Sequence, residues 1–183
     1  MENLFSAAFR YVQTENSSQL ENYATEMLVL VLCYLKSNEE KFSTLNEQIA
    51  ELLEFSVDDY KNVRFETQKR YTNFELKIIE VEKLIPDISV YVKDKLHTII
   101  EVKIDQGLNQ YTKEDGKTIN QLEAYASIKD VQKVILLSKN NEEYETKNNK
   151  IKFIRWHEIY EKLGTIQSDF IISHYLQFAV SIT

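Results

Sequence analysis

Hydrophobic positions in the first 55 or so residues recur at the spacing of a helix. Residues 4–12 carry apolar side chains every three or four positions, which predicts an amphipathic helix. A second helix is predicted to begin near Ser18, because its hydroxyl and Glu21 three places later form a capping-box pattern. That helix is apolar on nearly every side, which indicates burial. A third helical segment is predicted over residues 42–53.

After residue 59 the pattern becomes typical of β-strands. Val, Ile, Phe and Tyr are abundant and several stretches alternate, which predicts strands at residues 63–71, 74–85, 88–92 and 97–104. A polar segment then leads to a short predicted helix from Thr118 to Ile128. Two further strands are predicted at residues 131–138 and 151–156, followed by a helical stretch from His157 to about Phe178. This order predicts an α/β fold with a mixed central sheet flanked by helices.

The chain shows no internal repeat and no long linker, so one domain is predicted over residues 1–183. Its helical part covers residues 1–57, and the sheet core with the C-terminal helix covers residues 58–183. The single cysteine, Cys33, excludes an internal disulfide, and its apolar neighbours predict a buried thiol. The longest apolar run, residues 27–35, is much shorter than the roughly 20 residues that span a bilayer. We therefore expect a cytoplasmic protein with no membrane association.

The net charge of −7 argues against one class of protein. Proteins that bind nucleic acid through bulk electrostatics usually present a basic face. An enzyme with a carboxylate-rich metal site remains compatible, because bound cations offset the charge of their ligands.

Candidate chemistry gathers on two of the predicted strands. The only proline, Pro86, stands directly before Asp87 at the start of one strand, and Glu101 and Lys103 lie on the next. Side chains two residues apart on a strand share a face and lie about 7 Å apart at a rise of roughly 3.3 Å per residue. If the two strands pair as a hairpin, Asp87 reaches the same site. Two carboxylates and a backbone carbonyl are ligands suited to a hard cation such as Mg²⁺.

Two simpler interpretations stand beside this one. Glu-x-Lys also occurs elsewhere in this charged chain, so a solvated edge strand with an ordinary ion pair is an alternative, although only the copy at Glu101 and Lys103 has apolar residues on both sides. On the following helix, Gln121 and Tyr125 are four residues apart and share a face. They are interpreted either as a surface amide beside a half-buried tyrosine, or as a pair that contacts the substrate or orders the attacking water.

Pro-Asp, then Glu-x-Lys, then Gln-x-x-x-Tyr resembles the motif set of the PD-(D/E)XK nuclease superfamily, in particular its branch with a RecB-like nuclease motif. Residues 21–28, ENYATEML, are similar to the first core helix of that superfamily, where a glutamate often completes the metal site. On that match the helix glutamate is Glu26. The resemblance implies a restriction-endonuclease-like fold and hydrolysis of phosphodiester bonds by a metal-activated water.

The resemblance also implies roles for particular residues. Asp87, Glu101 and the carbonyl of Val102 would bind Mg²⁺ or Mn²⁺, with Glu26 as a further ligand. Lys103 would orient the water and stabilise the transition state, and Gln121 and Tyr125 would position the nucleotide. Two lysines of the adjoining polar segment are candidates for phosphate contact: Lys113 and Lys117.

Three functional hypotheses follow. The first is a nuclease acting on nucleic acid, with DNA favoured over RNA, in restriction, repair or defence against phage. The second is a nuclease-like binding or assembly module that is catalytically silent. The third is an unrelated α/β domain with a coincidental Glu-x-Lys. Because no specificity segment is recognisable, we expect targeting to come from further chain segments, a partner or homodimerisation.

Overall fold

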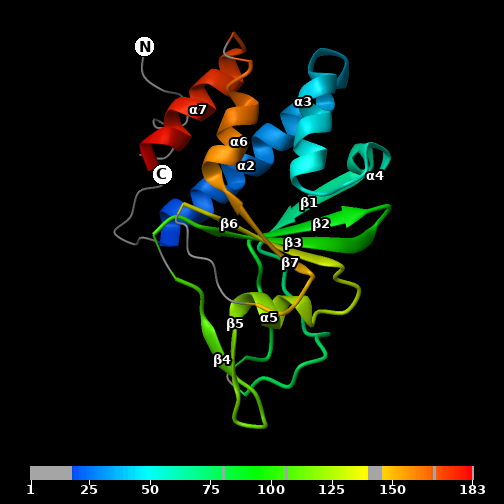
Figure 1. Ribbon diagram of the computed structural model, residues 1–183, viewed down its shortest axis with the longest axis vertical. Helices are drawn as coiled ribbons and strands as arrows, with labels where there is room; N and C mark the ends of the chain where they lie inside the picture. The colour runs from blue at the N-terminus through cyan, green and yellow to red at the C-terminus, as the bar shows by residue number, and fades with distance from the viewer. Residues whose placement is uncertain (1–17, 80, 106, 140–145, 167, 183) are drawn as a thin grey trace. The chain divides into compact units, whose positions relative to one another are not determined.

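The computed structural model describes residues 18–79, 81–105, 107–139, 146–166 and 168–182 (Figure 1). The chain forms two compact units, which we call the helical unit, residues 1–61 and 155–183, and the sheet unit, residues 62–154. The helix predicted at residues 4–12 and the side-chain cap predicted at Ser18 lie outside what the structure describes. The C-terminal helices belong with the N-terminal ones, a grouping that the predicted division near residue 58 does not contain.

Five helices make up the described part of the helical unit: α2 (Ser18–Ser37), α3 (Glu39–Leu52), α4 (Val57–Lys61), α6 (Trp156–Leu163) and α7 (Phe170–Ile182). The helices predicted from Ser18 and over residues 42–53 are confirmed, although α3 begins earlier and is kinked at Phe42. The C-terminal stretch was predicted as one helix and is two. Residues 164–169 separate them, and the chain restarts as a helix after Asp169.

Asp169 holds the start of α7 in place. Its buried carboxylate accepts hydrogen bonds from the backbone N–H groups of Ile171 and Ile172 at 3.0 and 3.2 Å. The hydroxyl of Tyr34 on α2 donates to it at 3.0 Å, and the ammonium of Lys41 on α3 lies 2.5 Å away. Burial opposes ionisation, but these donors lower the pKa of Asp169 below its ordinary value. One carboxylate thus joins three helices.

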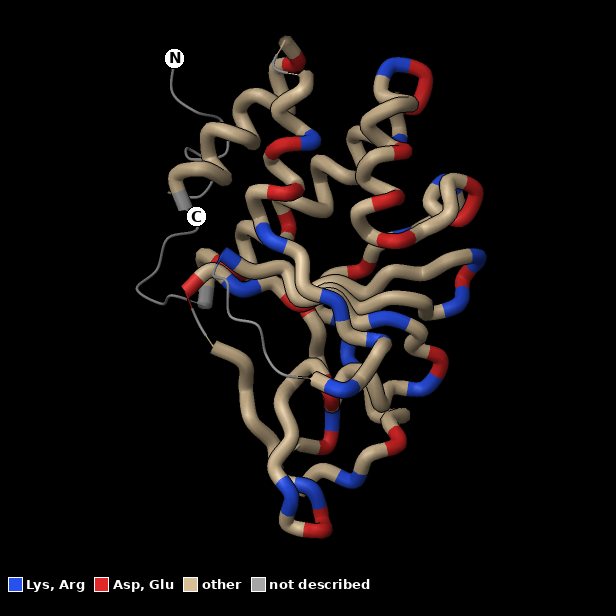
Figure 2. Tube along the Cα trace, viewed as in Figure 1, with Lys and Arg blue, Asp and Glu red and all other residues tan. Residues whose placement is uncertain are grey.

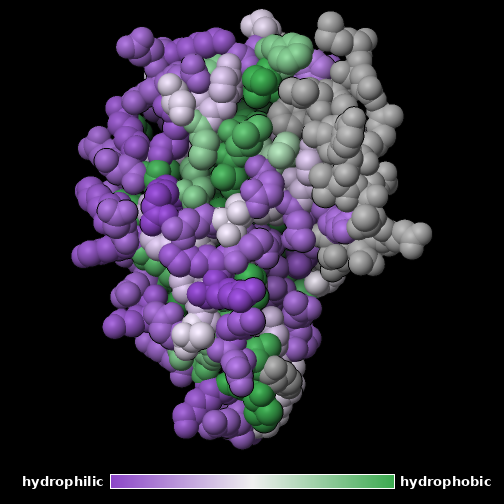
Figure 3. Space-filling model, turned by 180° about the vertical axis from the view of Figure 1, so that it is seen from behind, coloured by the Kyte–Doolittle hydropathy of each residue, from purple (hydrophilic) through white to green (hydrophobic). Residues whose placement is uncertain are grey.

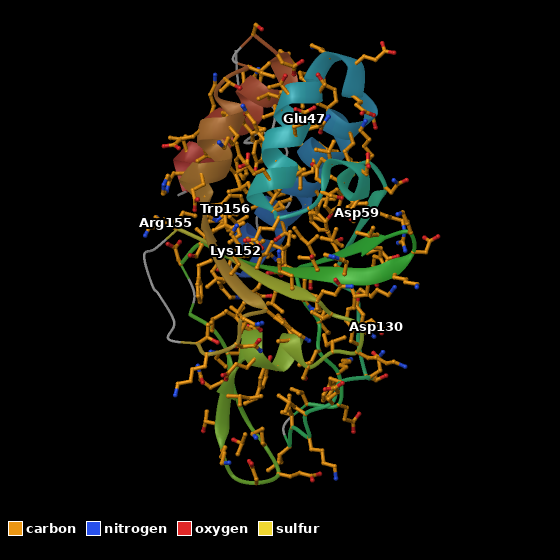
Figure 4. All side chains as sticks on the ribbon, turned by 45° about the vertical axis from the view of Figure 1, so that its right-hand side comes forward. Glu47, Asp59, Asp130, Lys152, Arg155 and Trp156 are labelled. Atoms are coloured by element: carbon orange, nitrogen blue, oxygen red, sulfur yellow. The ribbon has the colours of Figure 1, made fainter. Side chains whose placement is uncertain are left out.

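Aromatic side chains fill much of the core of the helical unit. Trp156, at the start of α6 in Figure 4, is buried and stacks on Tyr160 at 5.8 Å between ring centroids. The prediction of a buried thiol is wrong, because Cys33 is exposed on α2. Leu30, one turn earlier on the same helix, is also half exposed. The apolar pattern of α2 therefore overstated its burial.

The sheet unit contains a five-stranded sheet in the order β1-β2-β3-β6-β7. Its strands are β1 (Val63–Thr67), β2 (Ile88–Val92), β3 (Lys95–Lys103), β6 (Lys133–Ser138) and β7 (Ile151–Arg155). β1, β2 and β3 pair antiparallel, whereas β3 and β6 pair in parallel. The sheet is therefore mixed, and the predicted α/β class is confirmed.

β2 and β3 form the hairpin that the sequence suggested. Their register pairs Ile88 with Ile100, and Val92 with Lys95 across a two-residue loop. Both loop residues are left-handed, Lys93 at φ 50° and Asp94 at φ 64°. Two consecutive left-handed residues are the geometry of a type I′ turn, which matches the twist of the strands it joins.

The strand predicted at residues 74–85 is absent from the described chain, and the strand predicted at residues 63–71 ends at Thr67. Residues 68–87 instead leave the sheet and return, held by isolated bridges from Tyr71 to Leu84, from Phe74 to Ile128 and from Ile78 to Lys113. The apolar side chains of this excursion pack against the core cluster beneath the sheet: Phe74, Ile78 and Val81. Their alternation reflects that packing and not a strand ladder.

A hairpin and a short helix precede β6. β4 (Gln110–Thr112), in the predicted polar segment, and β5 (Thr118–Asn120), where the helix was predicted to begin, pair antiparallel, and α5 (Gln121–Ala126) follows. The predicted helix start at Thr118 is wrong by three residues, because Asn120 caps α5 through a capping box with Glu123. α5 covers one face of the sheet, where its buried side chains join those of β3 and β6 in one cluster.

Large apolar side chains are seldom exposed among the described residues. The face seen in Figure 3 is mainly hydrophilic, with a smaller apolar area. The most exposed large apolar residues are Leu30, Val57, Ile79, Phe170 and Val180. None of the helices that the structure describes combines the length and apolarity needed to cross a membrane.

Candidate metal centre

Asp87 lies where the pairing of β2 and β3 stops. The ladder ends at Ile88 and Ile100, and the next residue towards the N-terminus of β2 is Asp87 itself. The backbone N–H of Val102 donates to Asp87 Oδ2 at 2.8 Å. Pro86 has no N–H to donate to a ladder, which favours the end of a strand at this point. The carboxylate therefore takes the place of a backbone acceptor beside β3.

Glu101 and Lys103 share one face of β3, as predicted. Lys103 Nζ lies 2.9 Å from Glu101 Oε1, and the side chains are 14% and 3% exposed. β3 is an inner strand of the sheet, with β2 on one side and β6 on the other. The alternative of a solvated edge strand is therefore wrong.

One carboxylate oxygen of this site has no hydrogen-bond partner among the described residues. This atom, Glu101 Oε2, is buried. Buried polar atoms in native structures are nearly always hydrogen-bonded, so such an atom calls for an explanation, an ion among them. A hard cation would supply the positive charge that this oxygen lacks.

Burial opposes the ionisation of both acids, and the charge of Asp87 adds to the cost of ionising Glu101. Burial, and then the charge of Asp87, raises the pKa of Glu101 to about 8, although Lys103 acts in the opposite direction. Burial also raises the pKa of Asp87 above its ordinary value, against the lowering effect of the Val102 N–H. Without a cation, a buried pair of this kind favours a bound proton.

Gln121 and Tyr125 are both buried, so the interpretation as a surface amide beside a half-buried tyrosine is wrong. Gln121 Nε2 donates to the Tyr125 hydroxyl at 2.8 Å, and that hydroxyl donates to the carbonyl of Ile85 at 3.1 Å. Ile85 precedes Pro86 and Asp87. The pair therefore fixes the segment that carries the first acid, and its contact with substrate stays a prediction.

Gln121 also binds the segment before β4. Its N–H donates to the carbonyl of Asn109 at 2.9 Å, and its Oε1 accepts the N–H of Asn109 at 3.2 Å. Tyr111 on β4 lies near enough to Glu101 that, after burial, the carboxylate charge raises the pKa of its phenol. The sequence did not indicate either contact, because it predicted only a polar segment before the helix at Thr118.

The two lysines predicted to contact phosphate lie at the turn of the β4–β5 hairpin, which extends away from the sheet in Figure 1. Lys113 and Lys117 both pair with Asp115, at 3.1 and 3.6 Å. These ion pairs are with that aspartate and not with Asp87 or Glu101. Whether they bind phosphate stays a prediction.

Glu26 is exposed on α2, in the helical unit. Within the part of the chain that the structure describes, no group of three or more His, Cys, Asp or Glu is arranged to hold a metal ion. A cation at this centre would therefore depend on Asp87, Glu101 and the carbonyl of Val102. The role of Glu26 as a further ligand stays a prediction.

Sequence reasoning missed one side chain that touches an acid. Gln68, directly after β1, donates from Nε2 to Asp87 Oδ1 at 2.9 Å. Its backbone N–H donates to the carbonyl of Asp87 at 3.1 Å. The pattern of residues 63–71 predicted one continuous strand, and a continuous strand gives no reason to single out this position.

No family model matches the sequence, and no curated protein or solved structure matches it either. The interpretation of this centre therefore rests on its own chemistry.

Proposed function

We propose that this chain is a metal-dependent nuclease of the PD-(D/E)XK type, which hydrolyses phosphodiester bonds in nucleic acid, with DNA favoured. One observation carries the proposal. Glu101 is buried beside Asp87, and its Oε2 has no hydrogen-bond partner among the residues described. Two buried carboxylates with an unsatisfied oxygen are costly for a protein to keep unless a cation offsets them.

The residues present fit Mg²⁺ or Mn²⁺. Carboxylate and carbonyl oxygens are the hard donors these ions prefer, and a site with few protein ligands leaves positions for water and phosphate. Asp87, Glu101 and the carbonyl of Val102 would hold the ion. When bound, such an ion lowers the pKa of a coordinated water and offsets charge on the phosphoryl oxygens.

The chain's own residues would then orient the attacking water and stabilise the charge that develops on the phosphate. Lys103, fixed by Glu101 at 2.9 Å, presents an ammonium beside the acids, where it can donate to the attacking water or to charge that develops on phosphate. Tyr125 holds the carbonyl of Ile85, two residues before Asp87. Gln121 holds Tyr125 in turn, so α5 fixes the position of the first acid.

The order of elements gives the proposal further support. Pro-Asp and Glu-x-Lys lie on neighbouring antiparallel strands, and Gln-x-x-x-Tyr lies on the helix that covers the same face. These are the places that the resemblance implies for a restriction-endonuclease-like core. This arrangement supports the proposal that the three motifs act together in one site.

Cleavage assays test the proposal directly. The wild-type protein, Glu101→Ala and Asp87→Ala would be incubated with single-stranded DNA, double-stranded DNA and RNA, in Mg²⁺, Mn²⁺ or EDTA. Glu114→Ala is the matched control, because this exposed acid lies in the same unit at the β4–β5 turn. We expect metal-dependent cleavage by the wild type and the control only. Equal cleavage by all four proteins would overturn the proposal.

One observation favours a second candidate, the catalytically silent binding module. The described residues offer no third acidic ligand beside Asp87 and Glu101. Calorimetry with Mn²⁺ separates the nuclease from the silent module. A folded protein that does not bind the metal and does not cleave any substrate would be the silent module. A Glu26→Ala variant in the same assays would assign the third ligand if its loss of cleavage equals that of Glu101→Ala.

A further inference from the structure

Gln68 stands in a backbone conformation that a side chain disfavours. Its φ of 52° is in the left-handed region, directly after β1 ends at Thr67. Residues other than glycine and asparagine visit this region at a cost, and strained residues of this kind concentrate at functional sites. The turn of the chain at Gln68 ends the regular strand and brings its amide against Asp87.

Two donors hold the Asp87 carboxylate, one on each oxygen. Gln68 Nε2 donates to Oδ1 at 2.9 Å, and the N–H of Val102 donates to Oδ2 at 2.8 Å. Together they fix the plane of the carboxylate. Each carboxylate oxygen accepts at about two positions, so these two donors leave acceptor capacity on the carboxylate that a cation can use.

The two donors differ in what supplies them. Val102 uses its backbone and is fully buried, so no substitution removes that hydrogen bond cleanly. Gln68 uses its side chain and is exposed, whereas Asp87 is only 9% exposed. Shortening Gln68 therefore removes a contact to the acid without opening a cavity in the core.

We infer that Gln68 is a positioning residue that sets the affinity of the centre for its divalent cation by orienting Asp87. This inference rests on the proposed function. Side chains that hydrogen-bond a metal ligand without touching the metal orient that ligand, and their loss typically costs 10- to 100-fold in metal affinity or activity.

Gln68→Asn and Gln68→Gly test the inference. Both residues suit a left-handed backbone, asparagine is one methylene too short to keep the contact, and glycine has no amide. Lys93→Asn is the matched control, because Lys93 is exposed and left-handed at φ 50° in the β2–β3 turn. The readouts are the Mn²⁺ affinity by calorimetry, the Mn²⁺ concentration at half-maximal cleavage, and the melting temperature in EDTA.

We expect both Gln68 variants to bind Mn²⁺ about 10- to 100-fold more weakly. Their cleavage should recover at saturating Mn²⁺, and their melting temperature in EDTA should equal or exceed that of the wild type. The control should bind Mn²⁺ as the wild type does. Unchanged Mn²⁺ affinity in both variants would overturn this inference and leave the proposed function standing. A lowered melting temperature, with no recovery of cleavage at saturating Mn²⁺, would do the same. A wild type that neither binds Mn²⁺ nor cleaves removes the proposed function, and this inference with it.

Discussion

The two units of the molecule differ sharply in charge. The helical unit carries 14 Asp and Glu against 6 Lys and Arg, whereas the sheet unit carries 15 against 16. The difference is visible along the chain in Figure 2, and Glu47 and Asp59 in Figure 4 are acids of α3 and α4. The net charge of the whole chain thus describes the helical unit. It is a poor guide to what the sheet unit binds.

The two units also differ in how many donors each provides to a buried acid, and in the direction of that acid's pKa shift. Asp169 in the helical unit receives four donors, and its pKa lies below the ordinary value. Glu101 in the sheet unit has one ion pair and a raised pKa. A fully satisfied carboxylate stabilises a fold, whereas a buried and poorly satisfied one is typical of functional sites. The comparison distinguishes a structural acid from a candidate functional one.

The lysines that pair with these acids should give the largest contrast. Lys103→Met should lower the cleavage rate by about 100- to 1,000-fold, the usual loss when a group that stabilises the transition state is removed. Lys41→Met should leave cleavage unchanged and lower stability only slightly, because the Lys41 side chain is 59% exposed and solvent screens its ion pair. Single-turnover cleavage and urea unfolding measure both. Equal rates in the two variants would break the comparison.

Glu101→Gln should remove a pH dependence of the metal-free protein's stability. The pKa of Glu101 rises from 4.5 to about 8 on folding, so between these values the folded state holds a proton that the unfolded state has lost. Stability therefore falls as pH rises through this range. The glutamine should remove that slope and stabilise the protein at pH 8 by about 1–3 kcal/mol. Urea unfolding in EDTA at pH 5 and pH 8 provides the test, and an unchanged slope would contradict it.

Asp169→Asn should show the opposite sign. The folded pKa of Asp169 is lowered, so its contribution is present above the unfolded pKa of 3.8 and is lost as pH falls below it. The variant should lose about 1–3 kcal/mol at pH 7, since hydrogen bonds to a charged group are weakened. The difference from the wild type should shrink at pH 3. An equal difference in stability between variant and wild type at pH 7 and pH 3 would mean that the charge of Asp169 does not stabilise the contact between α2, α3 and α7.

The smallest effect concerns the hairpin lysines. Lys113→Ala combined with Lys117→Ala should raise the KM for DNA only a few-fold, because both ammonium groups already pair with Asp115. The slope of log affinity against log salt should fall by at most about 1 to 2. Binding titrations at two salt concentrations measure it. A loss of cleavage rate as large as that expected for Lys103→Met would make the β4–β5 hairpin part of the active site.

The parts of the fold that the sequence predicted are those that depend on local pattern. Asp87 and Glu101 could be placed together because one hairpin joins them, and alternation sets which side chains share a face. Gln68 and Asn109 could not be placed, because their contacts depend on the path of residues 68–87 and 105–120. Phe74, Ile78 and Val81 pack against the core cluster that includes α5, and a packed excursion of this kind leaves the same apolar alternation as a strand.

The turn between β2 and β3 has a consequence for how the protein folds. The two acids are only 14 positions apart, and the tight loop at Lys93 and Asp94 is all that must close to bring their strands together. Hairpins form in roughly 1–10 μs, long before distant strands meet. The repulsion between the carboxylates thus acts on one of the earliest native contacts. The refolding rate of the metal-free protein should consequently slow at alkaline pH and rise when Mn²⁺ is present from the start.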